Sequence, residues 1–328
     1  MEIQHFKWLR THSAPYNLSS SGMILLEPSS IEEMGRPGDV IDIIRNAYGA
    51  EDNGVMLVHG TQEGNFLALA AMRGKIDSVA IQVPEYEPIR VLPGFLGIKT
   101  VEISDAFQVP PHGLLFLSNP NNPTGSFIGE KALFELEETL ERRGSYAVLD
   151  SIFLDFVNKS PRLWFRNMIF TLSTSKFYTM NGVKVGWVIG DPAILREMSG
   201  ISDLISPGPL DLEAKYAAIL VSNREWVRNR NLSIIRGNRE ELMGSIKELK
   251  SVELSYVPDM PIAFAKPSCG LSGMELANKL LSRGVMVVPG EYFGLRQGIR
   301  IGLGSINREI AGIGLSIIRD VIKECDGP

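Results

Sequence analysis

Short apolar runs alternate with helical patterns along the first two thirds of the chain. The runs are VMLV (55–58), SVAIQV (78–83), GIKTVEI (97–103), LLFL (114–117), YAVL (146–149), MIFTL (168–172) and VGWVIG (185–190). Runs of this length, separated by helices, are typical of a largely parallel sheet whose two faces are both covered. The pattern therefore predicts an α/β fold with a mostly parallel central sheet and helices on both faces.

The helical patterns between these runs carry start and stop signals. Val40, Ile43 and Ile44 lie on one face of a predicted helix from Asp39 to Tyr48, and a glycine follows it. The glycine-rich stretch HGTQEGN (59–65) enters a second predicted helix over residues 63–73.

The regular alternation of strand and helix patterns ends near Asp211. Two long helical patterns (211–231 and 232–250) lead into short strands (252–257 and 262–266), a helix (273–283), two more strands (285–288 and 299–303) and a closing helix (307–325). We predict a large domain over residues 37–210 and a smaller α+β domain over residues 211–328. Residues 1–36 contain the turn signals SSSG and GRPG and are expected to form an irregular arm that packs on the small domain.

Composition narrows the class of protein. The 328 residues are 44% hydrophobic and 22% charged, with a net charge of −5 and no run of lysines and arginines, which argues against nucleic-acid binding. No apolar stretch approaches the roughly 20 residues that span a bilayer, and the first residues lack the apolar core of a signal peptide. The two cysteines, Cys269 and Cys325, form no metal-binding pattern. We expect a cytoplasmic protein without a metal, nucleic-acid or membrane partner.

Polar residues follow four of the predicted strands. HGTQEG follows the first run, SNPNNPTG follows LLFL, DSIF follows YAVL, and STSK follows MIFTL. Ligands of an open parallel sheet bind beyond the carboxyl ends of its strands. We therefore expect backbone amides, an asparagine, an aspartate and a lysine on one rim.

Each of these features also has a simpler interpretation. The glycine turn before residue 63 suits a phosphate, because a helix N-terminus offers free N–H groups, but it also suits a plain turn capped by Thr61. Asp150 needs a cation or hydrogen-bond donors if it is buried, and a helix cap or a structural ion pair would satisfy it. Lys176 is either solvated or, if buried among hydroxyls, a nucleophilic amine with a lowered pKa. Neither GxxxxGK[ST] nor GxGxxG occurs, which weakens a nucleotide-binding interpretation.

The order of these residues resembles that of a known family. SNPNNPTG (118–125), Asp150, the SxSK stretch ending at Lys176, then Lys184 and GW (186–187) are similar to the class I and II aminotransferases over about residues 40–305. These are pyridoxal 5′-phosphate (PLP) enzymes of the aspartate aminotransferase fold, and they include the histidinol-phosphate aminotransferase branch. The resemblance implies that residues 37–210 bind PLP.

The resemblance also implies roles for single residues. Lys176 would hold the cofactor as a Schiff base and move a proton, Asp150 would pair with the pyridine nitrogen, and Asn122 would hydrogen-bond the ring oxygen O3′ and contact substrate. A cis bond between Asn122 and Pro123 is expected. Under this interpretation the prolines and the glycine of the turn aim one asparagine at the cofactor.

The remaining contacts follow in the same way. Tyr86 would stack on the pyridine face and Arg300 would bind the substrate carboxylate bidentately, although a core aromatic and a strand-edge ion pair are their simpler interpretations. The implied phosphate ligands are Thr61, Gln62, Ser173, Ser175 and Lys184.

Three positions depart from the family pattern. Phe153 stands where a tyrosine usually donates to O3′, so the pKa of the cofactor imine should be higher. Lys184 stands where an arginine usually binds the phosphate. The tyrosine that usually reaches the phosphate from the neighbouring subunit has no clear counterpart, because Tyr48 lies too close to the first strand.

The resulting hypothesis is a homodimeric PLP-dependent aminotransferase that acts on an L-amino acid and a 2-oxo acid. Two alternatives are a decarboxylase or lyase of the same fold, similar to threonine-phosphate decarboxylases or C–S lyases, and a protein that binds PLP without turnover. The sequence does not indicate which amino acid is the substrate.

Overall fold

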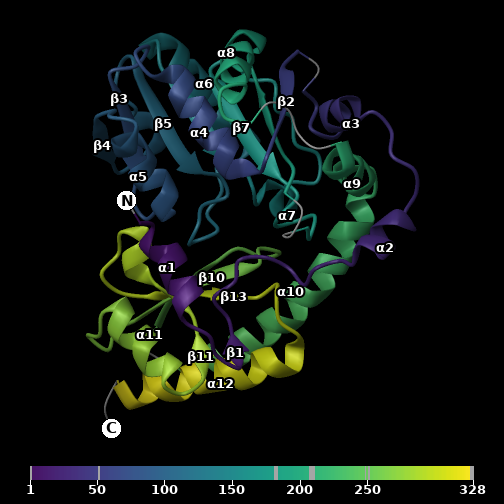
Figure 1. Ribbon diagram of the computed structural model, residues 1–328. Helices are drawn as coiled ribbons and strands as arrows, with labels where there is room; N and C mark the ends of the chain where they lie inside the picture. Colours follow the sequence, from purple (N-terminus) through teal and green to yellow (C-terminus); the bar gives the residue numbers. More distant parts are fainter. Residues whose placement is uncertain are drawn as a thin grey trace.

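The computed structural model describes residues 2–50, 52–180, 184–206, 211–247, 249 and 252–325. The chain forms a large sheet with helices on both faces and a smaller unit built around a second sheet (Figure 1). The long helix α10 (Arg224–Ile246) runs from one unit to the other, and the N-terminal segment lies along the smaller unit (Figure 1).

The central sheet has seven strands in the order β2-β8-β7-β6-β5-β3-β4. Strand β8 is antiparallel to both of its neighbours, and the other strand pairs are parallel. This confirms the predicted mostly parallel sheet. The strands are β2 (Gly54–Val58), β3 (Ser78–Gln82), β4 (Thr100–Ile103), β5 (Gly113–Ser118), β6 (Tyr146–Asp150), β7 (Met168–Ser173) and β8 (Gly186–Gly190).

Helices cover both faces of this sheet. Alternate residues of each strand point to opposite faces, so each strand contributes to both cores. Phe116 and Val148 pack with helices α4 (Thr61–Met72) and α8 (Pro192–Ser202) in one cluster. Leu117 and Leu149 pack on the other face with α3 (Val40–Ala47) and α6 (Glu130–Arg143). The connections also contain α5 (Glu87–Phe95), α7 (Leu154–Val157) and the 3₁₀ turn η1 (Ala106–Gln108).

The predicted break between the two long helices is wrong. Helix α9 (Asp211–Ser222) ends before Asn223, whose side chain donates to the carbonyl of Ile219 at 2.8 Å, and α10 then continues past Asn231. Asn231 is fully buried and donates to the carbonyl of Phe177 at 2.6 Å, so a tertiary contact keeps this polar residue inside the helix. Lys250, the predicted end of the second helix, lies outside the described residues.

The smaller unit has a four-stranded antiparallel sheet in the order β12-β13-β10-β9. The predicted strand at 285–288 is divided into β11 and β12, and β11 pairs with the N-terminal segment instead. The elements are β9 (Val252–Tyr256), β10 (Ile262–Pro267), α11 (Gly273–Leu281), β11 (Val285–Met286), β12 (Val288–Pro289), the 3₁₀ turn η2 (Gly290–Phe293), β13 (Ile299–Gly302) and α12 (Arg308–Cys325).

The expectation of an irregular N-terminal arm is wrong in one respect, because the segment contains helix α1 (Gln4–Thr11), strand β1 (Tyr16–Asn17) and the short helix α2 (Pro28–Glu32). Tertiary contacts hold α1: the carboxylate of Glu87 accepts the N–H groups of Gln4 and His5 at 3.0 and 2.6 Å. Trp8 donates to the carbonyl of Val287 at 2.9 Å. A helix of eight residues is marginal without such contacts, which local sequence does not reveal.

The proposed division of the chain at residues 36 and 210 stays a prediction. Helix α9 packs with α3 in the core of the large unit, while Leu242 of α10 and Trp8 of α1 belong to the core of the smaller unit. Helix α10 therefore contributes to both cores.

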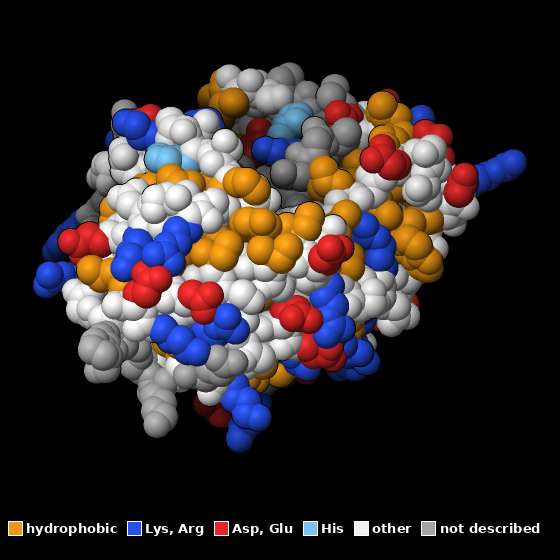
Figure 2. Space-filling view, turned by 90° about the horizontal axis from the view of Figure 1, so that it is seen from below, with side chains coloured by type: hydrophobic (Ala, Val, Ile, Leu, Met, Phe, Trp, Pro, Cys, Tyr) orange, Lys and Arg blue, Asp and Glu red, His pale blue; other side chains and the backbone are white. Residues whose placement is uncertain are grey.

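The surface carries mixed charge. Figure 2 shows positive and negative side chains interspersed on the face seen from below, with a band of hydrophobic side chains across it. Within the described ranges, no helix combines the length and the apolar character needed to cross a bilayer.

Candidate active site

A cavity of about 410 Å³ lies at the carboxyl ends of the central strands, bounded on its other side by α1 and β13. This volume lies within the range of small-molecule sites. The lining residues come from several segments that lie far apart in the sequence. They are His5, Phe6, Leu9, Asn17, Ser19, Ser20, Ser21, His59, Gly60, Thr61, Gln62, Tyr86, Ser118, Asn122, Asp150, Ile152, Phe153, Ser175, Lys176, Lys184 and Arg300.

Lys176 follows β7 and presents an amine with an unusual pKa. Burial, with the positive charges of Arg300 and Lys184, lowers the pKa of Lys176 to about 8, and the negative charge of Asp150 opposes part of this effect. An amine with this pKa is partly neutral near pH 7.5, so its lone pair is available to attack a carbonyl carbon.

Asp150 ends β6 and is 3% exposed. Burial raises the pKa of its carboxyl to about 6, although a hydrogen bond from Asn65 at 2.8 Å favours the charged form. Asn65 is itself oriented by Thr171, which donates to its Oδ1 at 2.6 Å. The other carboxyl oxygen of Asp150 accepts the amide of Ile152 at 3.3 Å. Among the described residues Asp150 neither caps a helix nor forms an ion pair, and it is positioned to receive a cationic or N–H group from the cavity.

The corner formed by β2, β7 and the start of α4 fits a phosphate. Gly60 has a φ of +92°, and a Cβ at Gly186 would lie only 2.7 Å from its Cα, so both positions require glycine. The first amides of α4 have no partner within the helix. Thr61 Oγ1 is buried without a hydrogen-bond partner, which is the state expected of a group that a ligand completes.

Hydroxyls and a lysine surround the same corner. Ser175 lines the cavity, and its Oγ lies 2.8 Å from the Oγ of Ser173. Ser173 is buried beneath Ser175 and does not line the cavity, so it supports Ser175. Lys184 is exposed at the rim, and Gln62 lies on the first turn of α4. These donors and charges suit the phosphate of PLP.

Arg300 lies on β13 and is 1% exposed. Its Nη1 donates to Asn122 Oδ1 at 2.9 Å and its Nη2 donates to the carbonyl of Ser19 at 2.7 Å. Its Nε is buried without a partner, and burial lowers the pKa of the guanidinium to about 10. A buried cation with unused N–H groups is a binding site for a carboxylate, which would supply both the charge and the acceptors.

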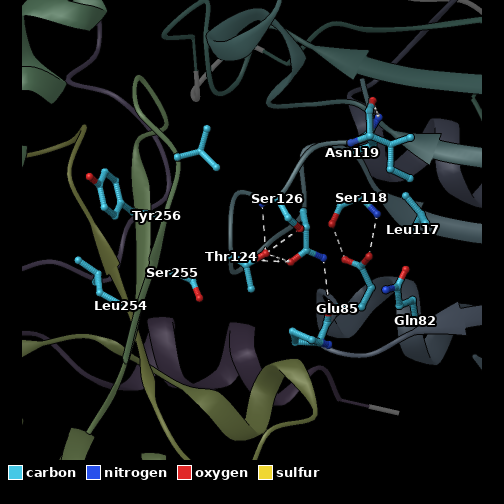
Figure 3. A pocket seen from close by; sticks show the side chains of 14 residues that line it. Gln82, Glu85, Leu117, Ser118, Asn119, Thr124, Ser126, Leu254, Ser255 and Tyr256 are labelled. Atoms are coloured by element: carbon cyan, nitrogen blue, oxygen red, sulfur yellow. Dashed lines mark hydrogen bonds between the residues drawn. The ribbon is translucent and has the colours of Figure 1, made fainter. Parts of the chain in front are cut away.

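Asn122 is held by a chain of hydrogen bonds that begins behind the cavity. Glu85, which is fully buried, accepts the hydroxyl and the amide of Ser118 at 2.5 and 2.8 Å (Figure 3). The Ser118 hydroxyl in turn accepts the amide of Asn122 at 2.9 Å. Burial raises the pKa of Glu85 to about 8. The carboxyl of Glu85 thus positions the turn that carries Asn122.

The predicted cis bond between Asn122 and Pro123 is wrong, because the cis bonds lie at Asn119–Pro120 and Val83–Pro84. Asn119 is the anchored asparagine of this turn: its side chain accepts the amide of Ile128 at 2.8 Å and donates to the carbonyl of Ile128 at 3.1 Å. The side chain of Asn122 instead points to Arg300, so the turn still delivers one asparagine to the cavity.

A second cavity, of about 480 Å³, borders the same turn and shares Ser118 with the first. In Figure 3, Thr124 and Ser126 of the turn lie across this cavity from Ser255 of β9. Its described walls combine hydroxyl and amide groups with Glu85, and they include no lysine, arginine or histidine. The chemistry therefore belongs to the first cavity.

Aromatic rings line the cavity wall nearest α1. Tyr86 lies there, and burial raises the pKa of its phenol. The ring of His5 meets the ring of Tyr86 edge-on, with 5.7 Å between the centroids. Phe153 is 1% exposed and also lines the cavity, so the position expected to hold a tyrosine presents no hydroxyl.

The structure brings nearly all of the predicted site residues together. Those that line the cavity are Thr61, Gln62, Tyr86, Asn122, Asp150, Ser175, Lys176, Lys184 and Arg300. Tyr48 is not among them: it is buried elsewhere and donates to Asp155 at 2.7 Å.

Sequence reasoning missed His5, Asn65 and Glu85. Asn65 had a signal, because it is a polar residue one turn after Thr61 in the otherwise apolar stretch NFLALAAM. His5 and Glu85 had none, since their roles depend on contacts with distant segments.

The chain is similar to known proteins in sequence. The family "Aminotransferase class I and II" matches residues 46–311. Histidinol-phosphate aminotransferase of Buchnera aphidicola subsp. Diuraphis noxia is 25% identical over 292 residues, which cover 82% of this chain and 78% of that protein.

Solved structures show the same fold. A PLP-dependent aminotransferase from Streptococcus suis 89-1591 superposes with a TM-score of 0.88 at 19% identity, covering 100% of this chain and 99% of that one. Aspartate aminotransferase of Thermus thermophilus, in a double mutant, superposes with a TM-score of 0.80 at 18% identity, covering 97% and 94%. The predicted fold is thereby confirmed, and the chain belongs to the class I and II aminotransferase family of PLP-dependent enzymes.

Proposed function

We propose that this chain moves an amino group between an L-amino acid and a 2-oxo acid, with PLP attached to Lys176. The observation that carries the proposal is the meeting of three buried charged groups in one cavity: the amine of Lys176, the carboxyl of Asp150 and the guanidinium of Arg300. Each is costly to bury alone, and PLP together with an amino acid would compensate all three.

Lys176, Arg300 and Asn122 would each have a separate role in the reaction. Lys176 would hold the cofactor through its aldehyde, and its amine, with a lowered pKa, would serve as the base that moves a proton from the substrate α-carbon. Arg300 holds the α-carboxylate and so fixes the orientation of the Cα–H bond. Asn122 has its oxygen occupied by Arg300, which leaves its amide N–H groups free to donate to the cofactor O3′.

Asp150 sets the electronic state of the cofactor ring. When bound, PLP supplies an electron sink for the negative charge left on the α-carbon, provided that its pyridine nitrogen stays protonated. The buried carboxylate of Asp150 would hold that nitrogen and stabilise its positive charge, because charges interact strongly where water is excluded. Asn65 keeps the carboxylate oriented toward the cavity.

Spectroscopy tests this proposal directly. Purified protein with PLP should absorb above about 400 nm, and borohydride should remove this band and leave the cofactor attached to Lys176 in a peptide digest. Adding an amino acid should convert the visible band to that of the pyridoxamine form, and a 2-oxo acid should restore it. L-Amino acids and histidinol phosphate form the donor panel, with Lys176→Ala as the control that lacks the attaching amine.

A decarboxylase or lyase of the same fold is the second candidate, and Phe153 is the observation that favours it. Phe153 has no hydroxyl, so position 153 supplies no hydrogen bond to the cofactor O3′. Tyr86 is the tyrosine among the described residues that line the cavity. A changed donor set around the ring alters which bond to the α-carbon breaks. Release of CO₂ or ammonia without the pyridoxamine band would identify this activity, and a band that never changes would identify a protein that only binds PLP.

We also propose that the enzyme is a cytoplasmic homodimer. Leu204, Ile205 and Leu212 are large apolar side chains with exposures of 86%, 57% and 60%. The first two follow α8, and Leu212 lies in the first turn of α9. Apolar side chains gathered at a surface are typical of an interface. Light scattering coupled to gel filtration should give the mass of two chains, and replacing Leu204 with aspartate should shift the protein toward one.

A further inference from the structure

Few positively charged side chains of the cavity are available to bind the substrate. Among the described residues that line it, Lys176, Lys184 and Arg300 are the lysines and arginines. The proposed function already assigns them to the cofactor aldehyde, the phosphate and the α-carboxylate. The side chain of His59 lies 3.0 Å from the carboxylate of Glu63, so its charge, when present, is compensated. No lysine or arginine among these lining residues remains for a second acidic group on the substrate.

His5 lies in the wall that helix α1 contributes to the cavity. It is 2% exposed, and its Nδ1 has no hydrogen-bond partner although its backbone N–H is bound by Glu87. Its ring meets the ring of Phe293 edge-on at 5.5 Å, and the guanidinium of Arg300 lies 5.3 Å from the centroid of that same ring. His5 is therefore one ring away from the group that holds the α-carboxylate.

The surroundings of His5 keep its imidazole neutral. Burial, followed by the positive charges of Arg300 and Lys176, holds the pKa of His5 well below its ordinary value. A neutral imidazole has one donor and one acceptor nitrogen, so it recognises hydroxyl, amide or ring N–H groups and does not neutralise a carboxylate. Phe6 and Leu9 of the same helix add apolar surface to this wall.

We propose that His5, Phe6 and Leu9 form the subsite for the side chain of the amino acid, and that this side chain is uncharged, with an apolar stem and a hydrogen-bonding tip. The proposal rests on the proposed function, since it names the substrate class of that same cavity. Its physical basis is that an unpartnered buried imidazole gains a hydrogen bond from such a tip, whereas a carboxylate would be buried without a cation.

Matched substrate pairs test the charge preference on the unaltered enzyme. Glutamine and glutamate have the same shape and differ in charge, and asparagine and aspartate form a second pair. The second-order rate constant of the cofactor band change should be at least tenfold higher for the neutral member of the preferred pair. A higher or equal rate with glutamate and aspartate overturns the proposal.

Tyrosine and phenylalanine, which differ by one hydroxyl, test the role of His5. In the unaltered enzyme we expect tyrosine to react about tenfold faster than phenylalanine, and in His5→Ala we expect this ratio to fall to near one through a higher KM for tyrosine. His5→Gln, which keeps an acceptor and a donor, should retain part of the ratio. Arg10→Ala is the matched control, since Arg10 is exposed on the same helix, away from the cavity.

A second readout separates specificity from damage to the site. The dissociation constant of PLP, measured by titrating the visible band without substrate, should be the same in His5→Ala and in the unaltered protein. An unchanged tyrosine-to-phenylalanine ratio in a His5→Ala protein that binds PLP normally overturns the role of His5. If no amino acid of either class changes the band, the proposed function fails instead.

Discussion

Asp150→Asn is the substitution that most directly tests the electrostatics of the site. The carboxyl of Asp150 is buried, accepts one hydrogen bond from Asn65, and has a pKa raised to about 6 from its ordinary value of 3.8. Because the folded-state pKa lies above that of the unfolded chain, the folded state retains a proton between these two values that the unfolded chain has lost. The free energy of unfolding therefore falls as the pH rises from about 4 to about 6.

This pKa difference corresponds to at most about 3 kcal/mol at neutral pH. The asparagine of the Asp150→Asn variant would have a similar shape without the charge and keep an oxygen for Asn65. In the protein without PLP, we expect this substitution to increase the free energy of unfolding by about 1 to 3 kcal/mol at pH 7. The increase should be small at pH 4 and vanish near pH 2, where Asp150 is protonated in both states.

Urea unfolding of the two cofactor-free proteins at pH 4, 5, 6 and 7.5 measures this difference directly. The same substitution should weaken PLP binding and reduce turnover, because the neutral amide offers no charge to the pyridine nitrogen. A stability difference that is independent of pH would refute the reasoning. So would a variant that loses stability at neutral pH while keeping its activity.

Three further predictions concern other residues. The rate at which PLP adds to the cofactor-free protein should rise about tenfold per pH unit below pH 8 and level off above it, because only the neutral amine of Lys176 reacts; a flat profile in stopped-flow absorbance would contradict this. Arg300→Lys should reduce kcat/KM about 100-fold with little change in PLP affinity, since it removes the planar fork; equal kinetics would argue against carboxylate binding there. Asp155→Asn should lower the free energy of unfolding by about 3 to 5 kcal/mol, because the buried Arg224, which lies 2.5 Å from Asp155, would lose its counter-charge. Urea unfolding measures this difference, with Glu253→Gln as a control at an exposed carboxylate.

Most of the central sheet could be predicted from the sequence, because strands buried on both faces read as uninterrupted apolar runs. The seven runs coincide with β2 to β8, with shifts at their ends. Most residues of the predicted site could also be identified from the sequence, because they directly follow predicted strands and the carboxyl ends of parallel strands meet at one edge of a sheet. Arg300 was located only through the family resemblance, because nothing local in QGIRIGLG indicates a substrate contact.

The errors have a common physical origin. Helix α1 exists because Glu87 binds its first amides, and α10 passes through Asn231 because that side chain reaches the carbonyl of Phe177. Propensity and periodicity describe what a segment prefers by itself, whereas these elements depend on partners at least 50 residues away. The misplaced cis bond is of the same kind, since two asparagines of the turn, Asn119 and Asn122, each precede a proline and only their surroundings distinguish them.

The sequence by itself determined the layered α/β architecture, the family, and the residues that meet at the ends of the strands, because these depend on local pattern and on motif order. The tertiary structure alone decided which groups are buried without partners. Burial is a property of the packed chain, and it lowers the pKa of Lys176, raises that of Asp150, and leaves Thr61, Arg300 and His5 with unused hydrogen-bonding capacity. The chemistry of the cavity follows from that burial, since the same side chains in water would be ordinary solvated groups.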